Sequence, residues 1–161
     1  MLTAPKRIFT RVYDLLIYDD LNIYSMIKII VKRLDYDRIK KCIKDAKQFN
    51  SISKKESENL LQELESAEIL EPEAIPSNVV TMNSIVKMSF VNTKKQIQFQ
   101  IVYPNQGNIK EYKISIFSPI ATALIGYKVG DEIEWIIPAV LTKLRIDEIN
   151  YQPEAAGHYN L

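Results

Sequence analysis

The spacing of apolar residues changes once along this chain, at residues 71–78. Before that segment, apolar side chains recur every three or four residues, as on one face of a helix. After it, they alternate with polar residues, as on strands with one wet face. The segment itself, EPEAIPSN, holds two prolines, which end a helix. We therefore expect a helical unit at 26–72 and a sheet unit at 76–161, preceded by an N-terminal extension at 1–25.

The helical unit is predicted to be a hairpin. Asp35 suits the N-cap of a first helix, with Asp37 in its first turn, and Ser53 with Glu56 forms a capping box for a second. The apolar positions of the two helices are Ile39, Cys42, Ile43, Ala46, Leu60, Leu61, Leu64 and Ala67. Each arm has about 13 residues and is roughly 20 Å long, which predicts a short antiparallel coiled coil.

The two arms carry opposite charge. Residues 28–47 hold eight basic and three acidic side chains, a net charge of +5, and residues 54–76 hold two basic and seven acidic ones, a net charge of −5. Antiparallel packing sets the arms side by side, where exposed charges favour the register more than they add stability. Alternating apolar residues at 27–31 predict a short strand that leads into the hairpin.

The sheet unit is predicted from five alternating segments. Their apolar positions are Val86, Met88 and Phe90; Ile97, Phe99 and Ile101; Tyr112, Ile114 and Ile116; Ile133, Trp135 and Ile137; and Leu144 and Ile146. Such segments are typical of a mostly antiparallel sheet. Ser118 as N-cap, Pro119 at the first position and Gly126 as a left-handed C-cap predict one short helix between strands, packed on the sheet through Ile120, Leu124 and Ile125. The expected fold class is therefore α+β.

Composition excludes several kinds of function. The chain has 161 residues and a net charge of +1, so the whole molecule does not strongly attract nucleic acid or anionic lipid. Cys42 and His158 are its only cysteine and histidine, which excludes an internal disulfide and a zinc site built from such ligands. No secretory signal or membrane-spanning run is present, so we expect a cytoplasmic monomer with no membrane partner. Residues 1–25 are either a loosely attached helix or untranslated, with Met26 as the working start.

Several segments resemble a known family. They are IPSNVVTMNSIVKM (75–88), IVYP (101–104), SPIATALIGYKVGDEIEW (118–135) and YQPEAAGHYNL (151–161). Together they are similar to the bacterial regulator of nucleoside diphosphate kinase family, which is related to the transcript cleavage factors GreA and GreB. The resemblance covers residues 27–161 and is strongest at VVTMNS and YQPEAAG.

The resemblance implies a partner and a docking site. It implies a C-terminal domain like FK506-binding protein, and binding to RNA polymerase near the mouth of its secondary channel. The positions that match the docking loop of Gre factors are Phe117, Ser118, Pro119 and Ile120. Gre factors can carry an acid before Ser-Pro, and Phe117 departs from that pattern.

The tip of the hairpin decides whether cleavage is expected. Cleavage factors carry acidic residues into the polymerase active site, because carboxylates hold Mg²⁺ and orient water. The tip here is Asn50, Ser51 and Ile52, and no acid lies between residues 48 and 53. The nearest acids, Asp45 and Glu56, fit a solvated surface and a cap. We therefore expect no catalytic residue, no metal and no cofactor. We expect the protein to compete with longer factors by occupying their site, and to contact nucleic acid only indirectly within the polymerase complex.

Two other functions remain open from the sequence. A prolyl isomerase needs an aromatic-lined pocket, for which Phe99, Tyr103, Tyr112, Phe117, Tyr127 and Trp135 are available, although alternation places Phe99, Tyr112 and Trp135 on a core face. The other open function is stimulation of transcript cleavage, even though the hairpin tip has no acidic residue. His158 is interpreted as a surface residue and Cys42 as a buried apolar one. YQPEAAG either packs the tail on the sheet or forms part of the docking face.

Overall fold

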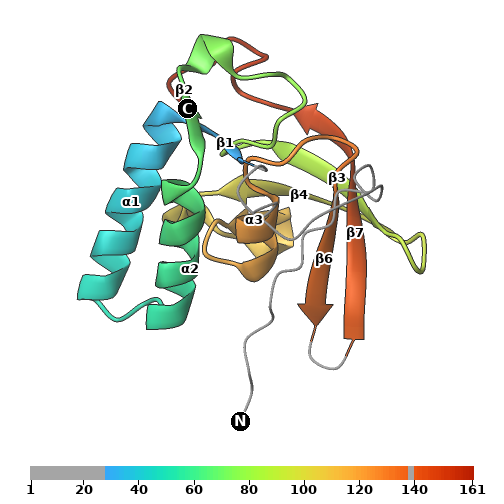
Figure 1. Cartoon of the computed structure of the whole chain (residues 1–161), viewed down its shortest axis with the longest axis horizontal. Coiled ribbons are helices and arrows are strands. Elements are labelled where there is room, and N and C mark those ends of the chain that lie inside the picture. Colours follow the sequence, from blue (N-terminus) through green and yellow to red (C-terminus); the bar gives the residue numbers. More distant parts are fainter. Residues whose placement is uncertain (1–27, 138–139) are drawn as a thin grey trace, which may run out of the picture.

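The computed structural model describes residues 28–137 and 140–161, and Figure 1 shows their arrangement. A helical hairpin lies at one side of the molecule, and strands β6 (Glu132–Ile137) and β7 (Val140–Tyr151) lie at the other. The predictions for residues 1–25 fall outside the described residues. Within the described ranges, no helix is both long enough and apolar enough to span a bilayer.

The hairpin is built from α1 (Arg33–Gln48) and α2 (Lys54–Glu65). Two short strands, β1 (Ile30–Lys32) and β2 (Glu68–Leu70), pair in parallel at its base, with Val31 opposite Ile69. The predicted capping box is confirmed: the Ser53 hydroxyl accepts from the Glu56 amide at 3.2 Å, and the Glu56 carboxylate accepts from the Ser53 amide at 3.2 Å. That box fixes where α2 begins.

The predicted N-cap of the first helix is wrong. The helix begins at Arg33 after an extended Lys32 that makes no side-chain cap bond, and Asp35 lies inside the first turn. Asp35 is buried, and its carboxylate accepts from the Met82 amide at 3.3 Å and from the Tyr103 hydroxyl at 3.0 Å. Because long-range partners occupy this carboxylate, it is not available to cap its own helix.

The sheet has the order β5-β4-β3-β7-β6. Besides β6 and β7, its strands are β3 (Ile85–Phe90), β4 (Gln96–Val102) and β5 (Lys113–Ser115). Every pairing is antiparallel except β4 with β5, which confirms a mostly antiparallel sheet in an α+β fold. The coiled coil and the likeness to FK506-binding protein stay predictions.

The third predicted strand is shorter than its alternation suggested. The chain leaves β4 through two 3-10 turns, η3 (Pro104–Gln106) and η4 (Ile109–Glu111), and β5 starts only at Lys113. Tyr112 ends η4 with a left-handed φ of 55°, and 71% of it is exposed. The prediction that Tyr112 faces the core is therefore wrong, because a turn and not a strand sets its direction.

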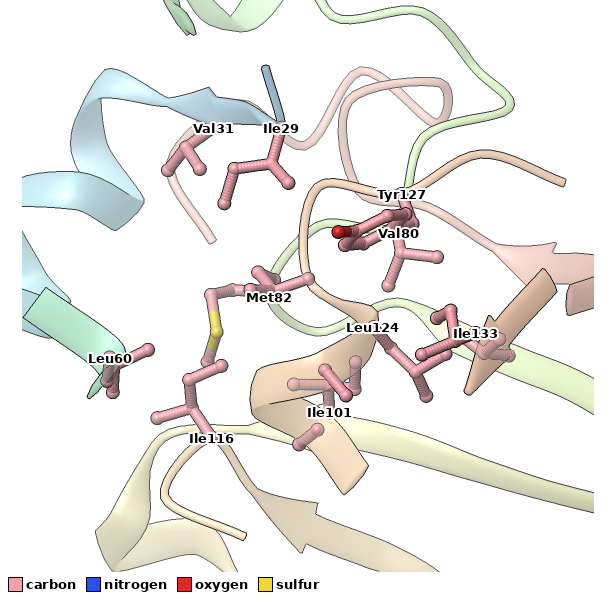
Figure 2. Packing of buried hydrophobic residues seen from close by; sticks show 14 of the residues in the cluster. Ile29, Val31, Leu60, Val80, Met82, Ile101, Ile116, Leu124, Tyr127 and Ile133 are labelled. Carbon is pink, nitrogen blue, oxygen red and sulfur yellow. The ribbon is translucent and has the colours of Figure 1, made fainter. Parts of the chain in front are cut away.

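One apolar core joins the hairpin to the sheet. It contains Ile39, Ile43, Leu60 and Leu64 of the hairpin together with buried residues of the strands, among them Phe99 as predicted. Figure 2 shows Met82 extending between Leu60 and Ile116. A small second cluster of Ile30, Ile75, Val79 and Leu70 lies at the base of the hairpin. The side chain of Trp135 lies outside the described part of the chain.

Candidate docking surface and hairpin tip

The docking loop, defined as Phe117–Ile120, runs from the end of β5 into the first turn of α3 (Pro119–Leu124). The Ser118 hydroxyl accepts from the Ala121 amide at 3.3 Å, and Pro119 holds the first helical position, so both predictions for this cap are confirmed. The Phe117 amide donates to the Ser115 hydroxyl at 3.1 Å, and the Ser118 amide donates to the Ser115 carbonyl at 2.9 Å. Hydrogen bonds therefore fix the backbone of the loop on both sides of its exposed residue.

The docking loop offers a partner only part of each side chain. Pro119 is exposed, whereas Phe117, Ser118 and Ile120 are half-buried. Phe117 and Ile120 pack against the main core. A partner bound here would meet a firm, partly apolar surface centred on Pro119.

Helix α3 is held on the body of the protein along most of its length. The Thr122 hydroxyl donates to the Ile116 carbonyl at 2.6 Å, which ties the first turn back to the preceding segment. Leu124 and Ile125 are buried as predicted, and Figure 2 shows Leu124 near Ile133 of β6. This anchoring gives the docking loop a rigid support.

Gly126 joins the end of α3 to the base of the hairpin. Its φ of +81° confirms the predicted left-handed end of the helix, a conformation that L side chains rarely adopt. An added Cβ would lie 2.6 Å from the Cβ of Ile29, and the Gly126 carbonyl accepts from the Ile30 amide at 3.2 Å. Glycine is therefore required here for both its backbone conformation and a close contact.

The hairpin tip folds around a left-handed asparagine. Asn50 has a φ of 52°, and the Ser51 amide donates to the Ala46 carbonyl at 2.9 Å. Asn50 and Ser51 are exposed and Ile52 is half-buried. Phe49, beside the tip, is 76% exposed. This exposed aromatic residue was not predicted from the sequence. Its position just after the last apolar residue of the first helix, Ala46, was the available signal.

The two acids nearest the tip have separate surroundings. Glu56 accepts from the Ser53 hydroxyl at 2.7 Å in addition to the Ser53 amide, so its carboxylate is engaged by the cap. Asp45 lies exposed on α1. Among the residues that the structure describes, no three His, Cys, Asp or Glu side chains gather as a group that could hold a metal ion.

A buried polar cluster at the start of α1 was not predicted. Burial raises the pKa of Asp35 to about 6, although Lys32, with its Nζ 3.4 Å away, and the Tyr103 hydroxyl both favour the charged carboxylate. Burial also raises the pKa of the Tyr103 phenol, and the neighbouring Asp35 raises it further. The sequence signal was Lys32 and Asp35 directly after the apolar run Ile29–Val31, although the charged Arg33 between them concealed it.

His158 lies on the surface as expected, whereas Cys42 is less buried than expected. His158 is exposed, and its Nδ1 lies 2.8 Å from the Tyr151 hydroxyl. Cys42 is half-buried, and burial is the first of the causes that raise the pKa of its thiol, which makes the thiolate scarcer. Within YQPEAAG, Gln152 and Glu154 are buried, so this part of the motif packs the tail onto the molecule.

Comparison with known proteins shows which proteins this chain resembles. A family model described as transcription elongation factor GreA/GreB, C-terminal part, matches residues 75–151. The chain is 41% identical over 100 residues to the regulator of nucleoside diphosphate kinase of Escherichia coli (strain K12), covering 62% of this chain and 74% of that protein. It is 40% identical over 95 residues to transcription elongation factor GreA of Orientia tsutsugamushi (strain Boryong), covering 59% of this chain and 60% of that protein.

A solved structure gives the same result. The prokaryotic transcription elongation factor GreA/GreB from Nitrosomonas europaea matches with a TM-score of 0.66 and 36% identity, covering 77% of this chain and all of that one. The fold and these matches thus define a GreA/GreB-like transcription factor. Within that class, the chain belongs to the regulator of nucleoside diphosphate kinase family. Membership supports a role in regulating transcription.

Proposed function

We propose that this protein binds bacterial RNA polymerase near the mouth of its secondary channel and competes there with GreA and GreB, without stimulating transcript cleavage. One observation carries the proposal. The hydrogen-bonded loop Phe117–Ile120 shares one apolar core with a hairpin whose tip holds no carboxylate. The choice of RNA polymerase as the partner is supported by the relatives named as transcription elongation factors GreA.

The docking loop suits a binding role because it is ordered before any partner arrives. Its backbone is fixed by Ser115 and Ser118, and its exposed centre is Pro119, whose ring leaves little freedom to lose. Preorganised surfaces bind more tightly, since less conformational entropy is lost on association. The loop therefore meets the physical requirements of a docking site.

The tip supports occupancy in place of catalysis. Holding Mg²⁺ for hydrolysis needs oxygen ligands, usually carboxylates, at the point of entry. Here Glu56 is engaged in its cap, and Asn50 and Ser51 at the apex offer no negative charge. With α1 at 16 residues and α2 at 12, the arms are about 24 Å and 18 Å long, which limits how far the tip can extend.

A charged substitution in the docking loop tests the binding site. Pro119→Glu places a negative charge at the exposed centre of the loop, and the first turn of a helix tolerates an acid, so the fold is retained. We expect at least a tenfold or so loss of affinity for core polymerase, since leaving a charge unpaired in an interface costs about 1.4 kcal/mol or more. The affinity is measured by pull-down or biolayer interferometry with purified polymerase.

Val91→Glu is the matched control. Val91 is an exposed apolar residue in the turn between β3 and β4, which lies away from α3 in Figure 1. This variant should bind polymerase as the unaltered protein does. Equal binding by the Pro119→Glu protein would remove the docking loop from the account.

The prolyl isomerase alternative gains no support. Its candidate aromatic residues lie in different settings: Phe99 and Tyr127 in the core, Tyr103 on Asp35, and Tyr112 exposed after η4. The relatives described above are named as transcription factors or as a regulator, and a shared fold class alone does not assign an activity.

A further inference from the structure

One ammonium group and two carboxylates are buried where the hairpin meets the sheet. The Lys32 side chain is 0% exposed, and its Nζ lies 2.7 Å from Glu154 Oε1 and 3.4 Å from Asp35 Oδ1. Lys32 ends β1 directly before α1, whereas Glu154 belongs to the segment that follows β7. The Lys32–Glu154 ion pair therefore joins the root of the hairpin to the far end of the chain.

Glu154 also contacts the sheet side of this junction. Its second oxygen, Oε2, accepts from the Thr81 hydroxyl at 2.7 Å. Thr81 itself is fixed by Ser84, whose hydroxyl lies 3.0 Å from the Thr81 hydroxyl and accepts from its amide at 3.1 Å. Both Thr81 and Ser84 precede β3. One carboxylate thus bridges the hairpin root and the entrance to the central strand of the sheet.

The segment 152–161 is here named the tail clamp. Besides Glu154, both of its ends bond to the body of the protein or to α1. At one end, Gln152 Nε2 donates to the carbonyls of Pro76 at 2.9 Å and Val79 at 2.7 Å. At the other end, Lys32 Nζ donates to the Leu161 carbonyl at 2.8 Å, and Arg38 Nη2 donates to the Asn160 carbonyl at 3.1 Å. The tail clamp therefore holds the first turns of α1 against the body of the protein. Its central contact is Glu154.

Apolar packing alone does not set a direction, because the hydrophobic effect is non-directional. A buried ion pair adds little net stability, but it penalises arrangements that separate its charges, since each charge would be left buried and unpaired. Lys32 lies on the same short strand, β1, as Ile30. Gly126, at the end of α3, contacts Ile29 and Ile30, so α3 is attached to the same root of the hairpin.

We propose that Glu154, acting through Lys32, is a positioning residue that fixes the direction of the hairpin relative to the docking loop. The Lys32 ammonium pairs with Glu154 Oε1, while Thr81 holds Oε2 on the sheet side, so the hairpin keeps one angle. The relevance to polymerase rests on the proposed function, whereas the fixed angle itself does not. A partner that contacts both the docking loop and the tip would then bind a single preset geometry.

The fixed angle is measured by the distance between two spin labels on the full chain. Labels are attached at Gln48→Cys near the tip and Glu148→Cys on β7, two exposed positions, with Cys42→Ser removing the native thiol. Pulsed electron spin resonance then gives the distribution of distances between hairpin and sheet. The unaltered junction should give a single narrow distribution.

Glu154→Gln keeps the shape and one acceptor but removes the nearer of the two carboxylates beside the Lys32 ammonium, the one that joins it to the sheet side. We expect the distance distribution to broaden by about twofold or more while the circular dichroism spectrum stays that of a folded protein. Glu71→Gln is the matched control, because Arg33 and Glu71 form an ion pair at the same root with both side chains more than half exposed. That control should leave the distribution narrow.

An unchanged distribution in a folded Glu154→Gln protein would overturn the proposal. If that protein does not fold, the triple variant Lys32→Met, Asp35→Asn and Glu154→Gln is measured instead, since it removes the buried ammonium together with both buried carboxylates, and the same two outcomes decide. The same variants are then tested for competition with GreA on polymerase, where Glu154→Gln should compete more weakly than Glu71→Gln. If the unaltered protein does not bind polymerase, the proposed function fails, and the distance measurement still decides the inference.

Discussion

At the scale of single residues, the most informative group is the Asp35 carboxyl. It is buried beside Lys32, Glu154 and the Tyr103 hydroxyl, and Arg38 lies 5.9 Å from the centre of the Tyr103 ring. Its pKa is raised from 3.8 to about 6, chiefly by burial. Between these two pKa values, the Asp35 carboxyl is protonated in the folded protein and ionised in the unfolded chain.

This gives a pH dependence of stability. Between about pH 4 and pH 6 the folded state binds more protons than the unfolded state, so the free energy of unfolding falls as pH rises and levels off above about pH 6. The size of the effect is about 3 kcal/mol, since one pKa unit corresponds to about 1.4 kcal/mol. In Asp35→Asn this contribution is absent. The difference in unfolding free energy between the variant and the unaltered protein should therefore shift by that amount, in favour of the variant, from pH 4 to pH 7 in urea titrations.

Titrating groups that both proteins share cancel in this difference. Parallel stability curves across the pH range would show that Asp35 does not carry the effect.

Gly126 gives a second prediction at the same scale. Gly126→Ala and Gly130→Ala both put a side chain on a backbone with positive φ, +81° and +91°, which costs about 1–2 kcal/mol. Only at Gly126 would the new Cβ also meet Ile29, and such overpacking costs about 1–3 kcal/mol more. Thermal or urea unfolding should therefore rank Gly126→Ala well below Gly130→Ala in stability. Equal losses would mean that the end of α3 does not depend on its contact with the hairpin root.

At the scale of elements, helix α2 depends on its capping box. It has only 12 residues, and short helices rely on caps and packing because nucleation is unfavourable. Ser53→Ala removes the hydroxyl that accepts from Glu56 and should lower the unfolding free energy by about 1 kcal/mol.

Ser66→Ala at the other end of α2 is the comparison. The Ser66 hydroxyl donates only to the Glu63 carbonyl on an exposed turn, so its loss should cost a few tenths of a kcal/mol or so. A loss at Ser66 as large as that at Ser53 would contradict the role given to the capping box.

Elements with local signals were predictable from the sequence, and elements set by distant contacts were not. Ser53 and Glu56 lie three residues apart and mark the start of α2, and Ser118 with Pro119 does the same for α3. The start of α1 was misplaced because the Asp35 carboxylate bonds to Met82 and Tyr103, which are 47 and 68 residues away. No local pattern encodes those partners.

At the scale of the whole molecule, the proposed docking loop was predicted from a resemblance to Gre factors and stays a prediction, whereas the contacts that hold its surroundings could not be predicted. The resemblance rests on the segment that begins with Ser118 and Pro119. The ion pair of Lys32 with Glu154 joins positions 122 residues apart, and neither residue alone is distinctive in the sequence. The structure thus explains part of the YQPEAAG motif, since Gln152 and Glu154 hold the tail clamp in place.

The central claim is that the docking loop and the acid-free hairpin act together, as a competitor that does not cleave. The most direct test adds the purified protein to stalled bacterial transcription complexes, alone and in competition with GreA, and follows the length of the transcript. The account predicts that the protein alone leaves the transcript intact and that increasing amounts of it suppress cleavage stimulated by GreA. Shortening of the transcript by the protein alone, or undiminished GreA activity at a large excess of the protein, would contradict it.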